Sequence, residues 1–171
     1  LIPVNIPMPS ILSAIQEDKD GNIWMAGHGM IRFNTALNRF DEKIDSFPYI
    51  KMPDKQIASM AIDNNNTIWV GCNNNGLIGY NIRNKTFKHF TRKDGLPDDN
   101  VSSLIVAGNN LWIACYSGIA CLKLDRMKMV SFGKDEGFPD MPVQKGSDFF
   151  YDNTDRLLYI GFHRAVVRFN P

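Results

Sequence analysis

Cysteine is scarce in this sequence, and its spacing argues against a disulfide framework and against a zinc site. There are three cysteines, Cys72, Cys115 and Cys121, and an odd number cannot pair completely. None of them forms the CxxC spacing that zinc sites commonly use. Cys115 and Cys121 flank a Ser117-Gly118 turn and could lie diagonally across a hairpin. We expect both instead to be small buried side chains, because free cysteine is commonly buried.

The sequence also lacks an excess of charge of either sign and a long apolar segment. Lys and Arg number 19 and Asp and Glu 18, so the 171 residues carry a net charge of +1, and 44% of them are hydrophobic. This balance is typical of a globular domain and argues against binding to nucleic acid or to an anionic membrane surface. The longest uncharged stretch, which includes 101–120, contains Ser, Asn and Gly and is no membrane span. The chain opens on Leu1-Ile2-Pro3, without an initiator Met or a signal peptide, so we expect a piece of a longer protein.

What the sequence does contain is a repeat of about 44 residues. An aromatic residue occupies the same place in a short motif four times, as Trp24, Trp69, Trp112 and Tyr159, at spacings of 45, 43 and 47 residues. An apolar residue followed by Pro recurs at 8–9, 52–53, 96–97 and 138–139, at spacings of 44, 44 and 42 residues. Because two independent landmarks share one register, chance is a poor explanation of the pattern.

Each repeat contains short apolar runs separated by Asn, Asp and Gly turns, which is typical of antiparallel strands. We expect first strands at 11–15, 57–62, 101–106 and 149–151, second strands that carry the aromatic residue, and third strands at 30–33, 77–80, 119–124 and 166–169. Fourth strands are expected at 39–40, 86–90 and 129–132. Four such strands make one β-propeller blade, in which we expect the inner, first strand to be the most buried. The sequence therefore predicts an all-β fold, a partial propeller over 1–171 with blades at about 8–51, 52–95, 96–137 and 138–171, the last without its outer strand.

The same residues resemble the two-component regulator propeller repeat. The resemblance rests on Gln16 to Trp24 (QEDKDGNIW), on Trp69-Val70-Gly71, and on Lys93 to Ser103 (KDGLPDDNVSS). A blade of that family reads roughly GLP-x-(D/N)-x-V, then D-x-x-G-x-(I/L)-W-(I/V)-G-T, then G-(L/I)-x-x-(Y/F)-(D/N). The resemblance covers residues 8–170, and three of the four units match well.

This resemblance implies the periplasmic sensor of a membrane-bound hybrid two-component regulator. Such sensors typically recognise oligosaccharides, signal to a kinase elsewhere in the protein, and meet the membrane only through other domains. The family builds larger propellers, so four units imply a fragment with open blade faces that forms homo-oligomers. The alternative is a closed four-bladed ring completed by Leu1–Ile6, although Pro3 and Pro7 restrict that segment to a sheet edge.

One loop position varies in chemistry while the scaffold around it repeats. It lies four residues after the aromatic residue, in the turn between the second and third strands, and it is either polar or aromatic. Planar hydrogen-bonding groups beside an aromatic ring suit a sugar, although ordinary turn variability is the favoured explanation of the pattern. With their neighbours, the candidate ligand-binding residues are His28, Asn73, Asn74, Tyr116, His163 and Arg164.

Other chemistry finds less support in the sequence. The fixed place of the Trp residues favours packing between blades over sugar stacking. The segment Asp18-x-Asp20-Gly21 begins like a calcium loop, but no Glu follows at the required distance. Acidic residues of the loops before the first strands share one face, as a glycosidase would need, yet turn formation explains them; these are Asp98, Asp99, Glu136 and Asp140. We therefore predict no catalytic residues, no metal site and no cofactor, with a protein-interaction scaffold or a propeller glycosidase or lyase as alternatives.

Overall fold

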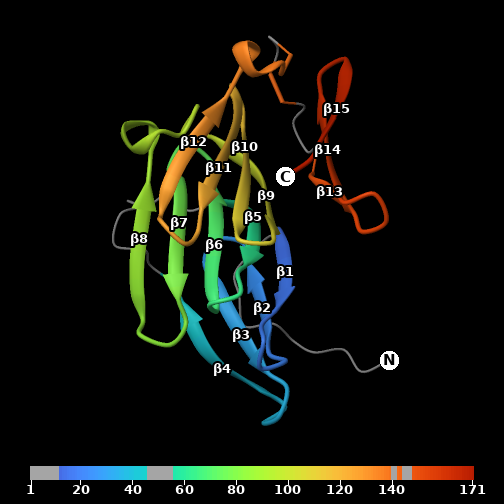
Figure 1. Ribbon diagram of the computed structural model, residues 1–171. Coiled ribbons are helices and arrows are strands. Elements are labelled where there is room, and N and C mark those ends of the chain that lie inside the picture. Colours follow the sequence, from blue (N-terminus) through green and yellow to red (C-terminus); the bar gives the residue numbers. More distant parts are fainter. Residues whose placement is uncertain (1–11, 46–55, 140–141, 144–147) are drawn as a thin grey trace.

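Four short antiparallel sheets follow one another along the chain, as the computed structural model shows for residues 12–45, 56–139, 142–143 and 148–171 (Figure 1). The first sheet consists of β1 (Ala14–Glu17), β2 (Ile23–Ala26), β3 (Met30–Asn34) and β4 (Arg39–Ile44). The second consists of β5 (Ile57–Ile62), β6 (Thr67–Cys72), β7 (Gly76–Asn81) and β8 (Thr86–Phe90). The third consists of β9 (Val101–Ala107), β10 (Asn110–Cys115), β11 (Gly118–Lys123) and β12 (Lys128–Phe132). The last sheet has three described strands, β13 (Phe150–Asp152), β14 (Leu157–Phe162) and β15 (Ala165–Phe169).

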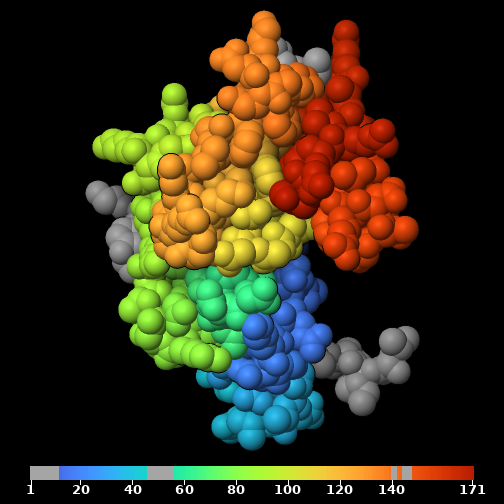
Figure 2. Space-filling view, viewed as in Figure 1, coloured from blue at the N-terminus to red at the C-terminus, as the bar shows by residue number. Residues whose placement is uncertain are grey.

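Within each sheet the strands pair in chain order, and every pair is antiparallel. This arrangement confirms the predicted all-β fold of propeller blades. Figure 2 shows the second and third sheets between the first, in blue, and the last, in red. The landmarks at 8–9 and 52–53, Asp140 and the segment Leu1–Ile6 lie outside the described residues.

Two short 3-10 helices, η1 (Arg92–Asp94) and η2 (Lys134–Glu136), follow β8 and β12 and were not predicted. The Asp94 carboxylate accepts a hydrogen bond from the Thr91 backbone N–H, and Gly95 ends η1 in the left-handed region at φ 102°. A three-residue helix is too short to show a helical period, which is why the sequence pattern gave no sign of it. No helix among the described residues is long and apolar enough to span a membrane.

The aromatic residue of each second strand lies at the junction to the next sheet. Trp24, Trp69 and Trp112 are all at most 4% exposed, and each belongs to a hydrophobic cluster shared with the following sheet. Their partners in the next sheet include Tyr80 for Trp24, Leu122 for Trp69 and Phe169 for Trp112. Tyr159 differs, since no described sheet follows it; it is half-buried and its ring contacts Phe150 of its own sheet.

The first strands also bond to one another at repeat spacing. β1 contacts β5, and β5 contacts β9, along the inside of the series of sheets (Figure 1). A serine in each first strand, or just before it, carries one of these bonds. Ser13 Oγ, next to β1, donates to the Ile57 carbonyl (2.7 Å), Ser59 Oγ accepts from Leu104 N–H (3.0 Å), and Ser103 Oγ accepts from the N–H of Phe149, next to β13 (3.2 Å).

The expectation that the first strand would be the most buried is wrong for this chain. Most of β1 is exposed, with Ile15 55% exposed, and Phe150 of β13 is 62% exposed. The second and third strands are buried more completely, as β6 and β7 illustrate. The reason is that middle strands have a neighbouring strand on both sides and a neighbouring sheet on their face, whereas a first strand is an edge.

The three cysteines are free and buried. Cys115 belongs to the cluster between the second and third sheets, and Cys121 belongs to the cluster between the third and last sheets. They therefore lie on opposite faces of the third sheet and do not form a bridge. Burial raises the pKa of both the Cys72 and the Cys115 thiol to about 12.

Candidate functional site

A cavity of about 540 Å³ lies where the first strands of the sheets begin and the second strands end. Ile57 begins β5 and Ser102 lies at the start of β9, whereas Asn73 follows β6 and Tyr116 follows β10. The described residues that line the cavity are Ser13, Gln56, Ile57, Ala58, Asn73, Asn74, Asn100, Ser102, Tyr116 and Val143. The site is thus assembled from segments that belong to all four repeats.

Asn73 is held in place by the residue that precedes the first strand of its own sheet. Its backbone N–H donates to the Gln56 carbonyl (3.1 Å), and its side-chain Nδ2 donates to Gln56 Oε1 (3.0 Å). The next residue, Asn74, has a positive φ of 60°, a backbone conformation that Asn tolerates better than most residues. The Asn73 side chain is therefore fixed at the cavity wall, and the exposed Asn74 follows it in the turn between β6 and β7.

Tyr116 occupies the equivalent turn of the third sheet. Its backbone N–H donates to the Asn100 carbonyl (3.0 Å), and its carbonyl accepts from Val143 N–H (3.1 Å). The main chain is therefore anchored on both sides while the side chain stays 56% exposed. An exposed aromatic ring on a fixed backbone provides a flat apolar surface at the cavity wall.

The chemistry of the lining is polar without formal charge. Amides come from Gln56, Asn73, Asn74 and Asn100, hydroxyls come from serines and from Tyr116, and no described lining residue is an acid or a base. Such a wall can donate and accept many hydrogen bonds and can place an aromatic face against C–H groups. Its volume falls within the range of about 300–1,000 Å³ that is usual for small-ligand sites.

The structure brings three of the six predicted ligand-binding residues to this cavity. Asn73, Asn74 and Tyr116 line it, whereas His28, His163 and Arg164 do not. His163 keeps the equivalent backbone bond, since its N–H donates to the Pro142 carbonyl (3.3 Å), but its turn belongs to the last sheet and lies outside the lining.

Sequence reasoning missed the lining residues that precede or begin the first strands. These are Ser13, Gln56, Asn100 and Ser102, together with Ile57, Ala58 and Val143. The available signal was their place just after the repeated Pro landmark, at the same end of the blade as the varying turn position.

The acidic residues of the loops before the first strands act locally. Asp99 Oδ1 accepts from Arg92 N–H (2.8 Å), Asp98 Oδ1 accepts from Asn100 N–H (2.7 Å), and Glu136 Oε2 accepts from Gly133 N–H (2.8 Å). None of these carboxylates lines the cavity. The described acids thus stabilise the turns, as the sequence pattern suggested.

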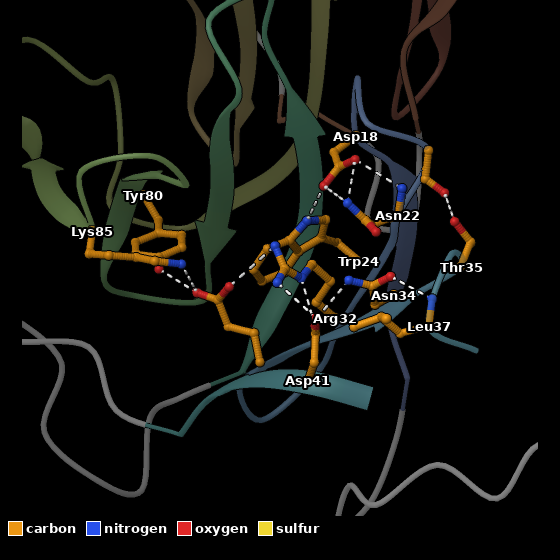
Figure 3. Close-up of polar contacts among 12 residues, drawn as sticks. Asp18, Asn22, Trp24, Arg32, Asn34, Thr35, Leu37, Asp41, Tyr80 and Lys85 are labelled. Atoms are coloured by element: carbon orange, nitrogen blue, oxygen red, sulfur yellow. Dashed lines mark hydrogen bonds and ion pairs between the residues drawn. The ribbon is translucent and has the colours of Figure 1, made fainter. Parts of the chain in front are cut away.

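Charged side chains gather instead at the outer edge of the first junction (Figure 3). Arg32 lies 5.7 Å from the centre of the Trp24 ring and pairs with Asp41 (2.8 Å). The hydrogen bond from Arg32 holds the pKa of Asp41 below its ordinary value. The Tyr80 hydroxyl donates to Glu42 (2.6 Å). Burial raises the pKa of Tyr80 above its ordinary value, and this hydrogen bond raises it further. The group joins the first and second sheets.

With this geometry in view, the repeats can be compared with known families. The family model described as two component regulator propeller matches residues 6–29 and 51–74. These two segments are two-component regulator propeller repeats. Each matched segment reaches through a first strand and its turn into the strand that carries Trp24 or Trp69. Comparison with curated proteins gives no match.

Solved structures share the fold of the chain. The extracellular domain assigned to the hybrid two component system BT3049 from B. thetaiotaomicron has a TM-score of 0.76 at 21% identity, over 94% of this chain and 22% of that one. The extracellular domain assigned to BT4673 of the same organism has a TM-score of 0.70 at 21% identity, over 94% of this chain and 20% of that one. A virginiamycin B lyase from Staphylococcus aureus has a TM-score of 0.65 at 14% identity, over 97% of this chain and 58% of that one. The chain spans about a fifth of the length of these two extracellular domains.

Proposed function

We propose that this chain is a ligand-binding segment of an extracytoplasmic, periplasmic sensor, and that the ligand is an oligosaccharide. The observation that carries the proposal is the cavity itself, which combines amide and hydroxyl side chains with the exposed ring of Tyr116. A sugar presents many hydroxyl groups and an apolar C–H face, and this wall is complementary to both. The likeness in fold to extracellular domains of hybrid two-component systems supports a sensing role.

The absence of charge in the described lining narrows the ligand to a neutral sugar. Burying a carboxylate or a sulfate without a cationic partner is costly, and the lining residues offer no cation. Binding is expected to be non-covalent, because the described carboxylates near this end accept hydrogen bonds from their own loops. Transmission to a kinase would take place in parts of the protein outside this chain.

The test is a glycan-array screen with the full chain, followed by calorimetry on the neutral oligosaccharides that bind. We expect Tyr116→Ala and Asn73→Ala to weaken binding by about tenfold or more, which corresponds to about 1.4 kcal/mol for each contact. His163→Ala is the matched control, since it changes the equivalent turn of the last sheet outside the cavity, and it should bind as the unchanged protein does.

Other outcomes would decide between the alternatives. Release of a shortened sugar product during incubation would refute the sensor proposal in favour of a glycosidase or a lyase. A protein partner that binds tightly, together with no binding to any glycan, would favour an interaction scaffold. Equal loss of binding in the His163→Ala variant would place the ligand elsewhere on this face.

A further inference from the structure

A second cavity, which we call the aromatic pocket, lies between the third and last sheets and has a volume of about 310 Å³. Tyr116 lines both this pocket and the cavity proposed to bind the sugar. Two consecutive residues divide between them, since Pro142 lines the pocket and Val143 lines the cavity. The bond from Val143 N–H to the Tyr116 carbonyl (3.1 Å) joins the two segments. The pocket and the cavity therefore adjoin each other along one wall.

The side chains that line the aromatic pocket are mostly apolar rings. Phe132, Phe138 and Phe162 line it together with Tyr116 and two prolines. The centroid of the Phe138 ring lies 5.9 Å from that of Phe132 and 6.4 Å from that of Phe162. Phe162 is buried, whereas the other two phenylalanines are half-buried. Part of the surface of these two rings is therefore available to a ligand in the pocket.

The pocket offers few side chains for hydrogen bonding. Ser117 Oγ donates to the Pro97 carbonyl (3.1 Å) and lies 3.2 Å from Asp98 Oδ2, so the preceding loop holds this hydroxyl. The other polar side chains of the described lining are those of Lys134, which is exposed, and Tyr116. Burying a polar group without a hydrogen-bond partner is unfavourable, so the hydroxyl groups of a sugar are poorly matched to this wall. An apolar ring is matched to it.

The junction between the second and third sheets has a smaller, buried side chain at the equivalent place. Leu96 stands there at the position of Phe138, each directly before the repeated Pro, and Leu96 is only 4% exposed. Asp99 closes that loop, since its carboxylate accepts from Arg92 N–H (2.8 Å) and its carbonyl accepts from Gly76 N–H (2.7 Å). Phe138 remains half-buried in the last junction. The accessible ring is thus a feature of the last junction rather than of the repeat.

We propose that the aromatic pocket binds an aromatic ring attached to the sugar, so that the ligand is a neutral oligosaccharide with an aryl or aroyl substituent. The sugar would lie on one side of Tyr116 and the ring on the other. A ring in the pocket would pack against Phe132 and Phe138, and such aromatic pairs are favourable beyond the area that they bury. The sugar part of this inference rests on the proposed function, whereas the ring site rests on the residues of the pocket alone.

The binding of 4-fluorobenzyl alcohol to the full chain, followed by ¹⁹F NMR, tests the ring site without any sugar. We expect the ¹⁹F signal to shift and broaden in a saturable way. The matched control is 2-fluoroethanol, which has the fluorine and the hydroxyl group without the ring, and it should not bind. A second pair of probes tests the ring on a sugar. We expect 4-fluorobenzyl β-glucoside to bind at least about tenfold more tightly than methyl β-glucoside, the gain expected for burying one aromatic ring.

Three variants locate the bound ring. Phe138→Ala should weaken the binding of 4-fluorobenzyl alcohol about two- to tenfold, the loss expected for one aromatic pair. Gly133→Leu adds a side chain at the pocket wall, where no atom beyond the chain neighbours lies closer than 4.0 Å to a Cβ, and it should weaken binding in a folded chain. Phe40→Ala is the matched control, because Phe40 is half-buried beside Phe33 in the first sheet (5.2 Å between centroids), and it should bind normally.

The ring site is refuted if the binding of 4-fluorobenzyl alcohol does not saturate, if 2-fluoroethanol binds equally well, or if Phe40→Ala weakens binding as much as Phe138→Ala. If Phe138→Ala does not fold, an unchanged affinity of Gly133→Leu refutes the site in the same way. Equal binding of the two glucosides refutes the aryl or aroyl substituent. Glycans that bind while 4-fluorobenzyl alcohol does not would overturn this inference and leave the proposed function standing. Binding of the alcohol with no binding of any glycan would refute the sugar and leave the ring site.

Discussion

Replacing Asp63 with alanine is expected to lower the free energy of unfolding by about 2–6 kcal/mol. The carboxylate is 4% exposed and accepts three hydrogen bonds, from Asn65 N–H (2.8 Å), Thr67 N–H (3.0 Å) and Trp69 Nε1 (2.9 Å). The two backbone donors lie in a turn that water can reach, so each loses about 0.5–1.5 kcal/mol. The indole nitrogen lies in the junction with the third sheet, where leaving it unpaired costs about 1–3 kcal/mol.

Urea denaturation of the unchanged chain and the variant measures the loss, with the m-value as a check that the unfolded state is the same. In a chain of this length the loss would lower the melting temperature by about 2–4 °C for each kcal/mol. Asp152→Ala is the matched control. Asp152 accepts from Thr154 N–H (2.7 Å) in the same kind of turn, is only half-buried, and lies in a sheet whose second strand has Tyr159 in place of the Trp, so its variant should lose clearly less stability.

A double-mutant cycle isolates the bond between the carboxylate and the indole. With Trp69→Phe as the second change, the coupling energy should be about 1–2 kcal/mol. The reasoning would be refuted if Asp63→Ala and Asp152→Ala cost the same, because the buried indole would then contribute nothing. A coupling energy near zero would refute it as well.

Three further predictions concern the thiols, a glycine and the open face of the last sheet. The thiols of Cys72 and Cys115 have a pKa of about 12 in the folded chain and of about 9 in the unfolded chain. The free energy of unfolding should therefore fall above pH 9 by about 1.4 kcal/mol per pH unit for each thiol. Urea titrations at several pH values would measure this fall, and a flat profile would contradict it. Gly79→Ala should cost about 1–3 kcal/mol in the same assay, because a Cβ there would lie 2.6 Å from the Trp69 ring, and an unchanged midpoint would show that the ring moves freely. We propose that a second copy of the chain covers the last sheet, where Val166 is 72% exposed. The sedimentation coefficient should then rise with protein concentration, and Val166→Glu should abolish that rise. A monomer at all concentrations would contradict the proposal.

Strands that contain a regular pattern of apolar residues were predictable from the sequence. Strands that contain mostly charged residues were less predictable. The sequence predicts the fourth strand of the second sheet at 86–90, which is where β8 lies. In the first sheet only 39–40 was predicted, whereas β4 extends to Ile44. The added residues are mostly charged, and they are held in the sheet by cross-strand partners such as Arg32, which pairs with both Asp41 and Glu42. A hydrophobic pattern cannot detect a strand whose partners are ions.

The site was predictable only in the part that a single blade determines. Asn73, Asn74 and Tyr116 follow the repeated Trp at a fixed distance, so the repeat alone pointed to them. Ser13 and Ser102 reach the cavity because successive first strands lie side by side, which depends on how the sheets pack on one another. Packing of that kind involves residues about one repeat apart and leaves no local signature.

The cavity and the junctions between sheets are coupled, because the residues of its wall also carry bonds from one sheet to the next. The Ser13 hydroxyl lies within hydrogen-bond distance of the Ala26 carbonyl of the first sheet (3.1 Å) and the Ile57 carbonyl of the second (2.7 Å). Tyr116 of the third sheet accepts from Val143 N–H, next to the last sheet. A ligand that contacts Ser13 and Tyr116 together would therefore resist any change in the angle between sheets. Because a ligand biases only those states that it binds unequally, such a change in angle is the motion through which binding at this cavity could be sensed.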